Sequence, residues 1–582
     1  MTMKKRMLSI AVMSVVMSVV PMSVEAAEYG PGIGGVVNID NEDSITIQNT
    51  ATMGDAIDQT AADSTLSITG FTDLTISTQN GSAYVDKTAA VETTVGTIKG
   101  KASVDSTVTF ENHGSTSATI LLNPGYPATN KVGLNVEATT INVNNIDTQG
   151  SAAAIATYKD YDLTFTGKTI NITSGGMGVN PSDTSTITLT ADTINVTSTG
   201  STAIHSKEDS LLTLDAREIT LNSAPDANAL TLASGKDKTG KVVIGSSRGI
   251  TLHLNGDMSI EGSQTLVLNN TRVIVKAGEQ VEITNLEGQN STFVLNSLTH
   301  NNTDPENQDL VRIENNQSDN LSIMMSGALN EQAASQEALM NQFLATVKVD
   351  AAGKPVTMGA EAGETAGGFT FDETGAMTPT ENPSMAAVGH FSAMNLAQWR
   401  SDVDGLTDRL GDLRVNPKHI GGWARVTGYE NEVATSVNVK SQTTTIQAGG
   451  DIRLNDHWIV GGAFSYTNLD ADFSNGFGKG EGYTLAGYLS GFFVCGGYVD
   501  LVGRVGRLSS EVRADTLSSF GGVLTGDYDN NALGLSIETG YHWSINQTFY
   551  VEPQAQLAYS LVLGDNFQSK TNSVKIEQED FE

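Results

Sequence analysis

A four-residue strand pattern recurs through the middle of the chain. Residues 193–196 read Thr193-Ile194-Asn195-Val196, and related tetrapeptides stand at 140–143, 169–172 and 218–221. Their second residues are all isoleucine and are 29, 24 and 25 residues apart. Short β-branched segments that return at a period of about 25 residues are typical of a solenoid in which each period forms one coil. The sequence therefore predicts a repeat array in this region.

Alternation within the repeat predicts how the coils stack. Side chains along a strand point alternately to two faces, so Ile194 and Val196 share one face and Asn195 takes the other. We expect an internal ladder of Ile141, Ile170, Ile194 and Ile219. The outward column would hold Asn142, Asn171, Asn195 and Thr220. The prediction is an all-β chain with a right-handed parallel β-helix over 27–330. A β-sandwich with hairpin turns is the alternative, but the scarcity of tight Asn-Gly turns favours the β-helix.

Composition narrows the class of protein. The chain has 582 residues, 33 Lys and Arg against 66 Asp and Glu, a net charge of −33 and one cysteine. A phosphate backbone would be repelled by this charge, which argues against nucleic acid as a partner. One cysteine supports neither a disulfide scaffold nor a cysteine-rich zinc module. Hydrophobic residues make up 39% of the chain and are scattered, which argues against disorder and against a helical membrane protein.

The first 26 residues have the three parts of a secretory signal peptide. Residues 4–6 are positively charged, residues 7–20 are apolar, and small residues precede a cleavage point between Ala26 and Ala27. The apolar run is shorter than the ~20 residues that a spanning helix needs. We expect the segment to be removed as the chain is exported through the periplasm.

Motifs indicate no catalytic, cofactor or metal residues, and we expect no enzyme. The repeat region has neither a G-x-S-x-G elbow nor an H-E-x-x-H motif. Residues 527–538 match part of an EF-hand loop, but Ala532 stands where that loop requires glycine. Residues 476–480 are glycine-rich but lack the Lys-Ser/Thr ending of a phosphate loop, so a hairpin is favoured. The remaining candidates are interpreted as incidental: His113, His205, His253, His300 and Cys495.

A connector and an amphipathic helix follow the repeats. Residues 331–388 are interpreted as a connector, helical or cap-like at first and a Gly-, Ala-, Thr- and Pro-rich linker over 350–388. Residues 389–414 carry apolar side chains at helical spacing. These are Leu396, Trp399, Val403, Leu406, Leu410 and Leu413. Such a helix needs a surface to cover its apolar face, and the inside of a barrel is the candidate.

From residue 415 the hydrophobic period changes to two. In 533–538, for example, large aliphatic residues alternate with glycine, serine and glutamate. A soluble sheet would show the same alternation, but aromatic residues also gather near segment ends, as at two membrane interfaces. They are Trp458, Phe464, Tyr466, Tyr541, Trp543, Phe549 and Tyr559. The sequence predicts an incomplete antiparallel transmembrane β-barrel of about seven to eight strands over 415–582.

Four motifs in this part resemble the autotransporter β-domain of type V secretion. They stand in family order at 410–414 (LGDLR), 421–426 (GGWARV), 496–500 (GGYVD) and 550–559 (YVEPQAQLAY). The resemblance covers 389–582 and implies a twelve-stranded outer-membrane barrel, with the barrel-assembly machinery and membrane lipid as partners. It implies that the 389–414 helix threads the pore and that the β-helix is a passenger at the cell surface. It also implies a lumen lined by Arg425, Arg453, Arg504 and Glu552.

Two departures from the family pattern carry further expectations. Some members cut themselves within the helix at a pair of asparagines, but only Asn395 stands there, between Met394 and Leu396. We therefore expect a tethered passenger. Seven strands are countable, with an eighth beginning near Val574, so we expect a truncated barrel that lacks about four or more strands. An unclosed sheet leaves unpaired amides in lipid, so the chain as written should not secrete.

The passenger's own role has two candidate classes. Polar Thr, Asn and Ser faces on a repetitive wall favour an adhesin or self-association factor, whose partner is a ligand on a host or sister cell. The alternative is a β-helical enzyme, a polysaccharide lyase or hydrolase, which needs charged residues clustered on one wall. A structural surface layer is a third possibility.

Overall fold

The computed structural model describes residues 27–581 with short gaps. The signal peptide and Val574 lie outside the described residues, whereas Ala27 begins the first strand. The gaps are at 30–32, 35, 41, 51–53, 60–64, 80, 87–94, 103, 115–116, 124–131, 147–151, 234, 236–237, 246–248, 301–308, 351–352, 364–365, 373, 416–418, 434–436, 516–522, 546–549 and 570–574. The chain divides into two compact units, which are described separately below.

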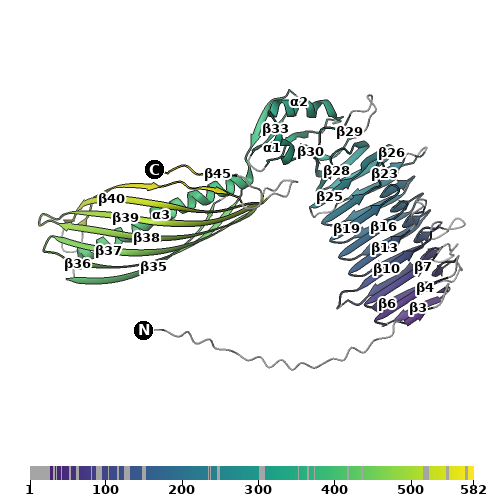
Figure 1. Ribbon diagram of the computed structural model, residues 1–582, viewed down its shortest axis with the longest axis horizontal. Helices are drawn as coiled ribbons and strands as arrows, with labels where there is room; N and C mark the ends of the chain where they lie inside the picture. Colours follow the sequence, from purple (N-terminus) through teal and green to yellow (C-terminus); the bar gives the residue numbers. More distant parts are fainter. Residues whose placement is uncertain are drawn as a thin grey trace. The chain divides into compact units, whose positions relative to one another are not determined.

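The first unit is a parallel β-helix with three strands in each coil (Figure 1). Each strand pairs in parallel with the third strand before and after it, so three ladders run through the stack. The first ladder is β1 (Ala27–Tyr29), β4 (Ser44–Asn49), β7 (Asp73–Thr78), β10 (Thr107–Asn112), β13 (Thr140–Asn145), β16 (Thr169–Ser174), β19 (Thr193–Ser198), β22 (Glu218–Asn222) and β25 (Ile250–Asn255). The second is β2 (Ile33–Gly34), β5 (Ile57–Gln59), β8 (Tyr84–Asp86), β11 (Ile120–Leu122), β14 (Ile155–Thr157), β17 (Val179–Pro181), β20 (Ile204–Lys207) and β23 (Asn228–Ala233).

The third ladder completes each coil. It is β3 (Val36–Asp40), β6 (Thr65–Phe71), β9 (Val95–Gly100), β12 (Val132–Glu137), β15 (Tyr161–Thr166), β18 (Thr186–Thr190), β21 (Leu211–Asp215) and β24 (Lys241–Ile244). A long strand, β26 (Asp257–Asn269), pairs with β23 and β24 and so continues the second and third ladders. The parallel β-helix is thereby confirmed over the sandwich, while the right hand of its coil stays a prediction.

The isoleucine ladder lies in the core as the sequence predicted. Ile141 pairs with Ile170, Ile170 with Ile194, and Ile194 with Ile219, and all four are fully buried. The outward column is hydrogen-bonded along the stack. The Asn171 side chain donates to Asn142 at 3.0 Å, and that of Asn195 donates to Asn171 at 2.9 Å. Each coil is thus joined to the next by apolar contact inside and by amide contact outside.

A second polar stack lies inside the corner that follows the first ladder. Asn112, Asn145 and Ser174 occupy equivalent places in successive coils and are buried. Asn112 donates to the carbonyl of Ser117 at 2.7 Å, and Asn145 to that of Ala153 at 3.1 Å. Buried carbonyl groups need such partners because an unpaired one costs roughly 1–3 kcal/mol. The corner can therefore turn without leaving backbone groups unsatisfied.

The region predicted as a connector is an ordered continuation of the sheet, which corrects the 331–388 boundary. It follows β27 (Thr271–Val275), β28 (Val281–Leu295), β29 (Val311–Asn316) and β30 (Asp319–Met325), and contains α1 (Gly327–Gln332), α2 (Gln336–Thr346), β31 (Val347–Val349), β32 (Val356–Ala360), β33 (Gly368–Phe371) and β34 (Met377–Thr380). β32 pairs in parallel with β30 and antiparallel with β33. These strands were missed because each is four or five residues long and contains Gly, Ala, Thr or Pro, so no period is visible.

The amphipathic helix is α3 (Pro383–Val415), six residues longer at its start than predicted. Asn382 accepts hydrogen bonds from the backbone N–H groups of Ser384 and Met385 at 3.0 and 3.2 Å. Asparagine as the cap and proline at the first helical position are favoured at helix starts. The Asn382-Pro383 pair is the signal that the prediction overlooked.

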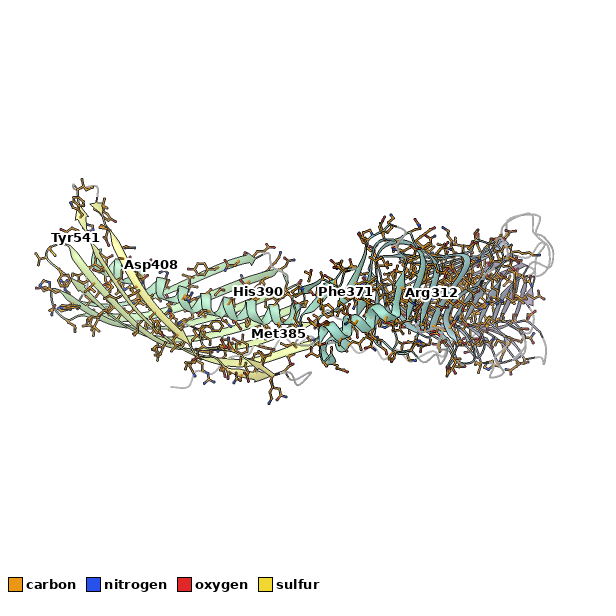
Figure 2. All side chains as sticks on the ribbon, turned by 90° about the horizontal axis from the view of Figure 1, so that it is seen from above. Arg312, Phe371, Met385, His390, Asp408 and Tyr541 are labelled. Atoms are coloured by element: carbon orange, nitrogen blue, oxygen red, sulfur yellow. The ribbon has the colours of Figure 1, made fainter. Side chains whose placement is uncertain are left out.

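The C-terminal strands form one antiparallel sheet that lies along α3 (Figures 1 and 2). In order they are β35 (Ile420–Val433), β36 (Val439–Arg453), β37 (Trp458–Phe473), β38 (Gly476–Phe492), β39 (Gly497–Asp515), β40 (Val523–Tyr541) and β43 (Gln554–Val562). Figure 2 shows Met385, His390 and Asp408 spaced along the helix beside these strands. In the described part of the chain, β35 and β43 stand at the two edges of the sheet.

Two short hairpins accompany the sheet, and one of them corrects the predicted eighth strand. β41 (Trp543–Ser544) pairs with β42 (Tyr550–Val551), and β44 (Asn566–Gln568) pairs with β45 (Lys575–Glu577). The segment expected to begin an eighth strand near Val574 is therefore β45, whose partner is β44 and not a strand of the large sheet. Its apolar alternation is only three residues long, too short to tell a barrel strand from a hairpin. Among the described residues, no helix has the length and apolarity needed to cross a membrane.

Candidate functional site

The two faces of the C-terminal sheet have inverted polarity. Its outward side chains are large, apolar and solvent-exposed, as at Leu485 (61%) and Leu557 (74%). Its inward side chains are polar and buried, among them Thr443, Thr445, Gln447, Asp451, Ser465, Thr467, Thr484, Asp500, Arg504 and Glu538. A soluble sheet buries its apolar face instead, because that removes apolar area from water. A sheet exposed to lipid has the observed arrangement.

The apolar face of α3 is covered by the inner face of this sheet. Trp399, Leu406, Leu410 and Leu413 are at most 2% exposed. Leu406, Leu410 and Leu413 pack in one cluster with Ile459, Tyr488 and Val502, and Leu396 borders a second cluster around Trp399. Val403 lies within α3, but its side chain is outside the described set. The sheet thus supplies the surface that the amphipathic pattern required.

Polar contacts fix the helix at several heights. Ser392 contacts the Tyr528 hydroxyl at 3.0 Å, and the Asn395 amide donates to Ser510 at 2.7 Å. Nearer the C-terminal end, Arg409 donates to the buried Asp451 carboxylate at 2.8 Å. Sequence alternation placed Asp451 on the polar face, but its partner is 42 residues away, so the pair could not be read from spacing.

The four residues expected in the lumen have different surroundings. Arg425 donates to the Gly405 carbonyl and pairs with Asp408 at 2.7 Å, both on α3. Arg504 is buried and donates to the Trp399 carbonyl. Arg453 instead bonds the backbone of the turn after β36, at Asn455. Glu552 accepts from His542 at 3.0 Å beside a cavity of about 1180 Å³. Two of the four therefore contact the helix.

The near-motifs lie in strands. Residues 476–480 open β38, and residues 527–538 lie within β40, whose paired residues alternate in burial. Neither is a loop, so neither can wrap an ion or a phosphate. No group of three or more His, Cys, Asp or Glu that could hold a metal is found among the described residues. Cys495 is exposed in the turn between β38 and β39, the fourth and fifth strands of the sheet.

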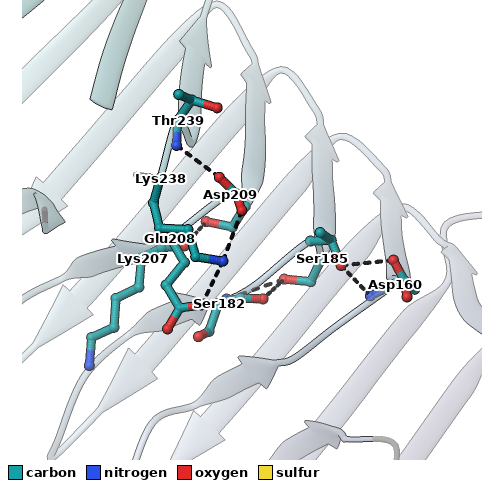
Figure 3. A network of polar contacts seen from close by, with 10 residues as sticks. Asp160, Ser182, Ser185, Lys207, Glu208, Asp209, Lys238 and Thr239 are labelled. Carbon is teal, nitrogen blue, oxygen red and sulfur yellow. Dashed lines mark hydrogen bonds and ion pairs between the residues drawn. The ribbon is translucent and has the colours of Figure 1, made fainter. Parts of the chain in front are cut away.

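One corner of the β-helix carries a charged network (Figure 3). Lys238 pairs with Asp209 at 3.0 Å and with Glu208 at 3.6 Å. Asp209 also accepts from the backbone N–H of Thr239 at 2.8 Å, and this bond, with Lys238, lowers the pKa of Asp209. The side chain of Asp183, one coil away, raises the pKa of Glu208. These groups pair one another across successive turns, so the network holds the corner together.

Comparison with known proteins identifies the C-terminal part. Residues 421–581 match the family model described as the autotransporter beta-domain. The serine protease EspP of Escherichia coli O157:H7 is 28% identical over 222 residues, which are 37% of this chain and 16% of that protein. The pertactin autotransporter of Bordetella parapertussis is 27% identical over 190 residues, 31% of this chain and 20% of its own. The chain thus spans a fifth or less of the length of these two relatives.

Two solved structures are similar to the same degree. The beta domain of the Bordetella autotransporter BrkA is 23% identical, with a TM-score of 0.25 and coverage of 28% of this chain and 66% of that one. The translocator domain of the autotransporter NalP from Neisseria meningitidis is 14% identical, with a TM-score of 0.26 and coverage of 32% and 66%.

The family match and the inverted sheet agree with each other. An apolar outer face suits an outer-membrane domain, and the parallel β-helix stands N-terminal to it, where an autotransporter carries its exported part. The β-domain lies in the outer membrane and the β-helix is exposed at the cell surface. With its β-domain at residues 421–581, this chain is an autotransporter of the type V secretion pathway.

Proposed function

We propose that the exported β-helix is an adhesin or self-association factor that stays tethered to its β-domain. The observation that carries the proposal is the outward wall of the first ladder in coils β13, β16 and β19, here called the Thr/Asn wall. It consists of Thr140, Asn142, Asn144, Thr169, Asn171, Thr173, Thr193, Asn195 and Thr197. All nine side chains are uncharged, in a chain whose net charge is −33.

The third ladder provides the contrast. In the neighbouring coils its outward positions include Glu137, Asp162 and Asp215. A neutral wall of hydroxyls and amides can approach another surface without the repulsion that acidic walls would create. Each side chain offers hydrogen-bond donors and acceptors. Repetition from coil to coil then sums weak contacts into useful avidity.

The membrane partners belong to the same proposal. The exposed leucines and isoleucines of the sheet would contact outer-membrane lipid, and the barrel-assembly machinery would insert the domain. The adhesive partner would be a ligand on a host or sister cell.

Display of the full chain on bacterial cells tests the adhesive role. We expect cells that carry the chain to settle in suspension or to bind matrix-coated surfaces, and Asn171→Lys to reduce this several-fold. The matched control is Thr188→Lys, which places the same charge at an equivalent outward position of the third ladder, in β18. Equal loss with both variants, or no adhesion by the displayed parent, would contradict the proposal.

An enzyme is the second candidate, and one observation favours it. His253 contacts Glu218 at 2.9 Å on the outward wall of the first ladder. A histidine held by a carboxylate can act as a general base. Turnover of a polysaccharide or ester panel by displayed cells, abolished by Glu218→Gln, would support an enzyme. Adhesion that is unaffected by Glu218→Gln would favour the first candidate.

A further inference from the structure

Trp399 of α3 fits into a gap on the inner face of β39. The indole is fully buried. A Cβ added at Gly506 would stand 2.5 Å from the Trp399 ring and 3.0 Å from the Tyr483 carbonyl oxygen. Real Cβ atoms do not approach other heavy atoms so closely, so a side chain at 506 and the ring exclude each other. The absence of a side chain at Gly506 therefore leaves the space that the ring fills.

Arg504 lies over the same ring, two residues before Gly506 on the same face of β39. Its guanidinium carbon is 4.2 Å from the centre of the Trp399 ring, and its Nη1 donates to the Trp399 carbonyl. Gly534, which is paired with Arg504 on β40, gives the guanidinium its room, because a Cβ there would be 2.5 Å from Nε. A cation over an indole face is attracted by the ring. Arg504, Gly506 and Gly534 are together called the Trp399 socket.

A second aromatic side chain of α3 has a matching gap. Phe391 is fully buried, and a Cβ added at Gly478 would stand 2.5 Å from its ring. Gly478 lies on β38, in the glycine-rich stretch that was considered as a phosphate loop and rejected. Phe391 and Trp399 are eight residues apart, which corresponds to about 12 Å along a helix. Two bulky rings at a fixed spacing thus meet two glycines on neighbouring strands.

We propose that the Trp399 socket and Gly478 set the axial register at which α3 stops inside the β-domain, with Arg504 as a positioning residue. A slide of one helical turn, about 5.4 Å, would take both rings out of their gaps together and would break the Arg504 contacts. Leucines elsewhere on α3 are flexible enough to repack after such a slide, whereas the rings are not. The proposal concerns the β-domain and does not depend on what the passenger binds.

A disulfide can report this register in the full chain. Cys495→Ser removes the single cysteine, and Asn395→Cys with Ser510→Cys then places two thiols where side chains are 2.7 Å apart. We expect most of the membrane-inserted parent to form this disulfide. Gly506→Val should lower the cross-linked fraction at least five-fold, and Gly478→Val should lower it less because Trp399 keeps its place.

Two further variants keep the test specific. Gly487→Val is the matched control on the same sheet, because a Cβ at Gly487 meets nothing within 4 Å, and it should cross-link like the parent. Trp399→Ala combined with Gly506→Val should restore the fraction, since the new side chain fills the space left by the ring. Failure of this rescue, or equal loss with Gly487→Val, would overturn the proposal.

Tryptophan fluorescence separates positioning from general stability. The chain has four tryptophans, so the Trp399 signal is the difference between the parent and Trp399→Phe. Arg504→Met should shift this difference spectrum, and Arg504→Lys, which keeps the cation, should shift it less and retain more of the disulfide. An unchanged spectrum and an unchanged disulfide in Arg504→Met would show that Arg504 has no positioning role.

Discussion

The β-helix and the C-terminal sheet are both built from alternating strands, yet they bury opposite kinds of side chain. In the β-helix Ile194 is fully buried and Asn195 faces outward. In the C-terminal sheet Leu485 is exposed and its neighbour Thr484 is buried. The same period of two therefore serves two solvents. What decides which face turns inward is whether the outside is water or hydrocarbon.

The largest expected effect is in the β-helix core. Ile194→Ala removes buried methyl groups from a ladder that cannot collapse around the cavity, because its backbone spacing is fixed by the strands above and below. We expect a loss of about 2–5 kcal/mol, confined to neighbouring coils. Protease sensitivity of the displayed passenger measures it, with the outward Thr193→Ala as control. Similar sensitivity in both variants would mean that burial does not hold the stack.

Charge on the outer face of the sheet comes next. Leu485→Arg, near the middle of β38, should cost about 2–4 kcal/mol if that face meets lipid. The measurement is the fraction of chain that inserts into vesicles or outer membrane. Thr188→Arg on the β-helix serves as the control and should change stability by no more than about 0.5 kcal/mol. Normal insertion of Leu485→Arg would break the comparison drawn above.

The outward amide column should contribute less than the core. Asn171 both donates to Asn142 and accepts from Asn195, so Asn171→Ala should cost about 1–2 kcal/mol. Thermal unfolding of the passenger, followed by amide exchange in β13, β16 and β19, would show it. Thr220→Ala, at the end of the same column, is the control and should be near neutral. A loss as large as that of Ile194→Ala would mean that the outer column and not the core defines the stack.

The smallest effect is a dependence on pH. Burial lowers the pKa of His205 below its usual 6.5; Lys207 acts in the same direction and Glu261 opposes it. The unfolded chain therefore takes up a proton at a higher pH than the folded one. Stability is full above pH 6.5 and is lost as pH falls through the folded pKa. His205→Gln should flatten this slope in pH-dependent unfolding; an unchanged slope would assign it to carboxylates.

Much of the fold could be read from the sequence because its strongest signals are periodic. The isoleucine ladder, the amphipathic face of α3 and the alternation of β38 to β40 each depend on neighbours two, three or four residues apart. The strands β32 to β34 were missed because they are short and paired with distant segments. The contact between Arg504 and Trp399 spans 105 residues, and no local pattern encodes it. Gly506 and Gly478 were visible only as glycines, since the rings they accept belong to another element.

The unequal coils of the β-helix have a consequence for its history. Successive marker isoleucines are 29, 24 and 25 residues apart, yet they pair without a shift of register. All the extra length lies in corners, which are outside the ladders. A lineage that inserts or deletes residues at a corner keeps every rung in place and pays no cost in the core. The passenger can therefore acquire new surface loops, one corner at a time, while its scaffold is inherited intact.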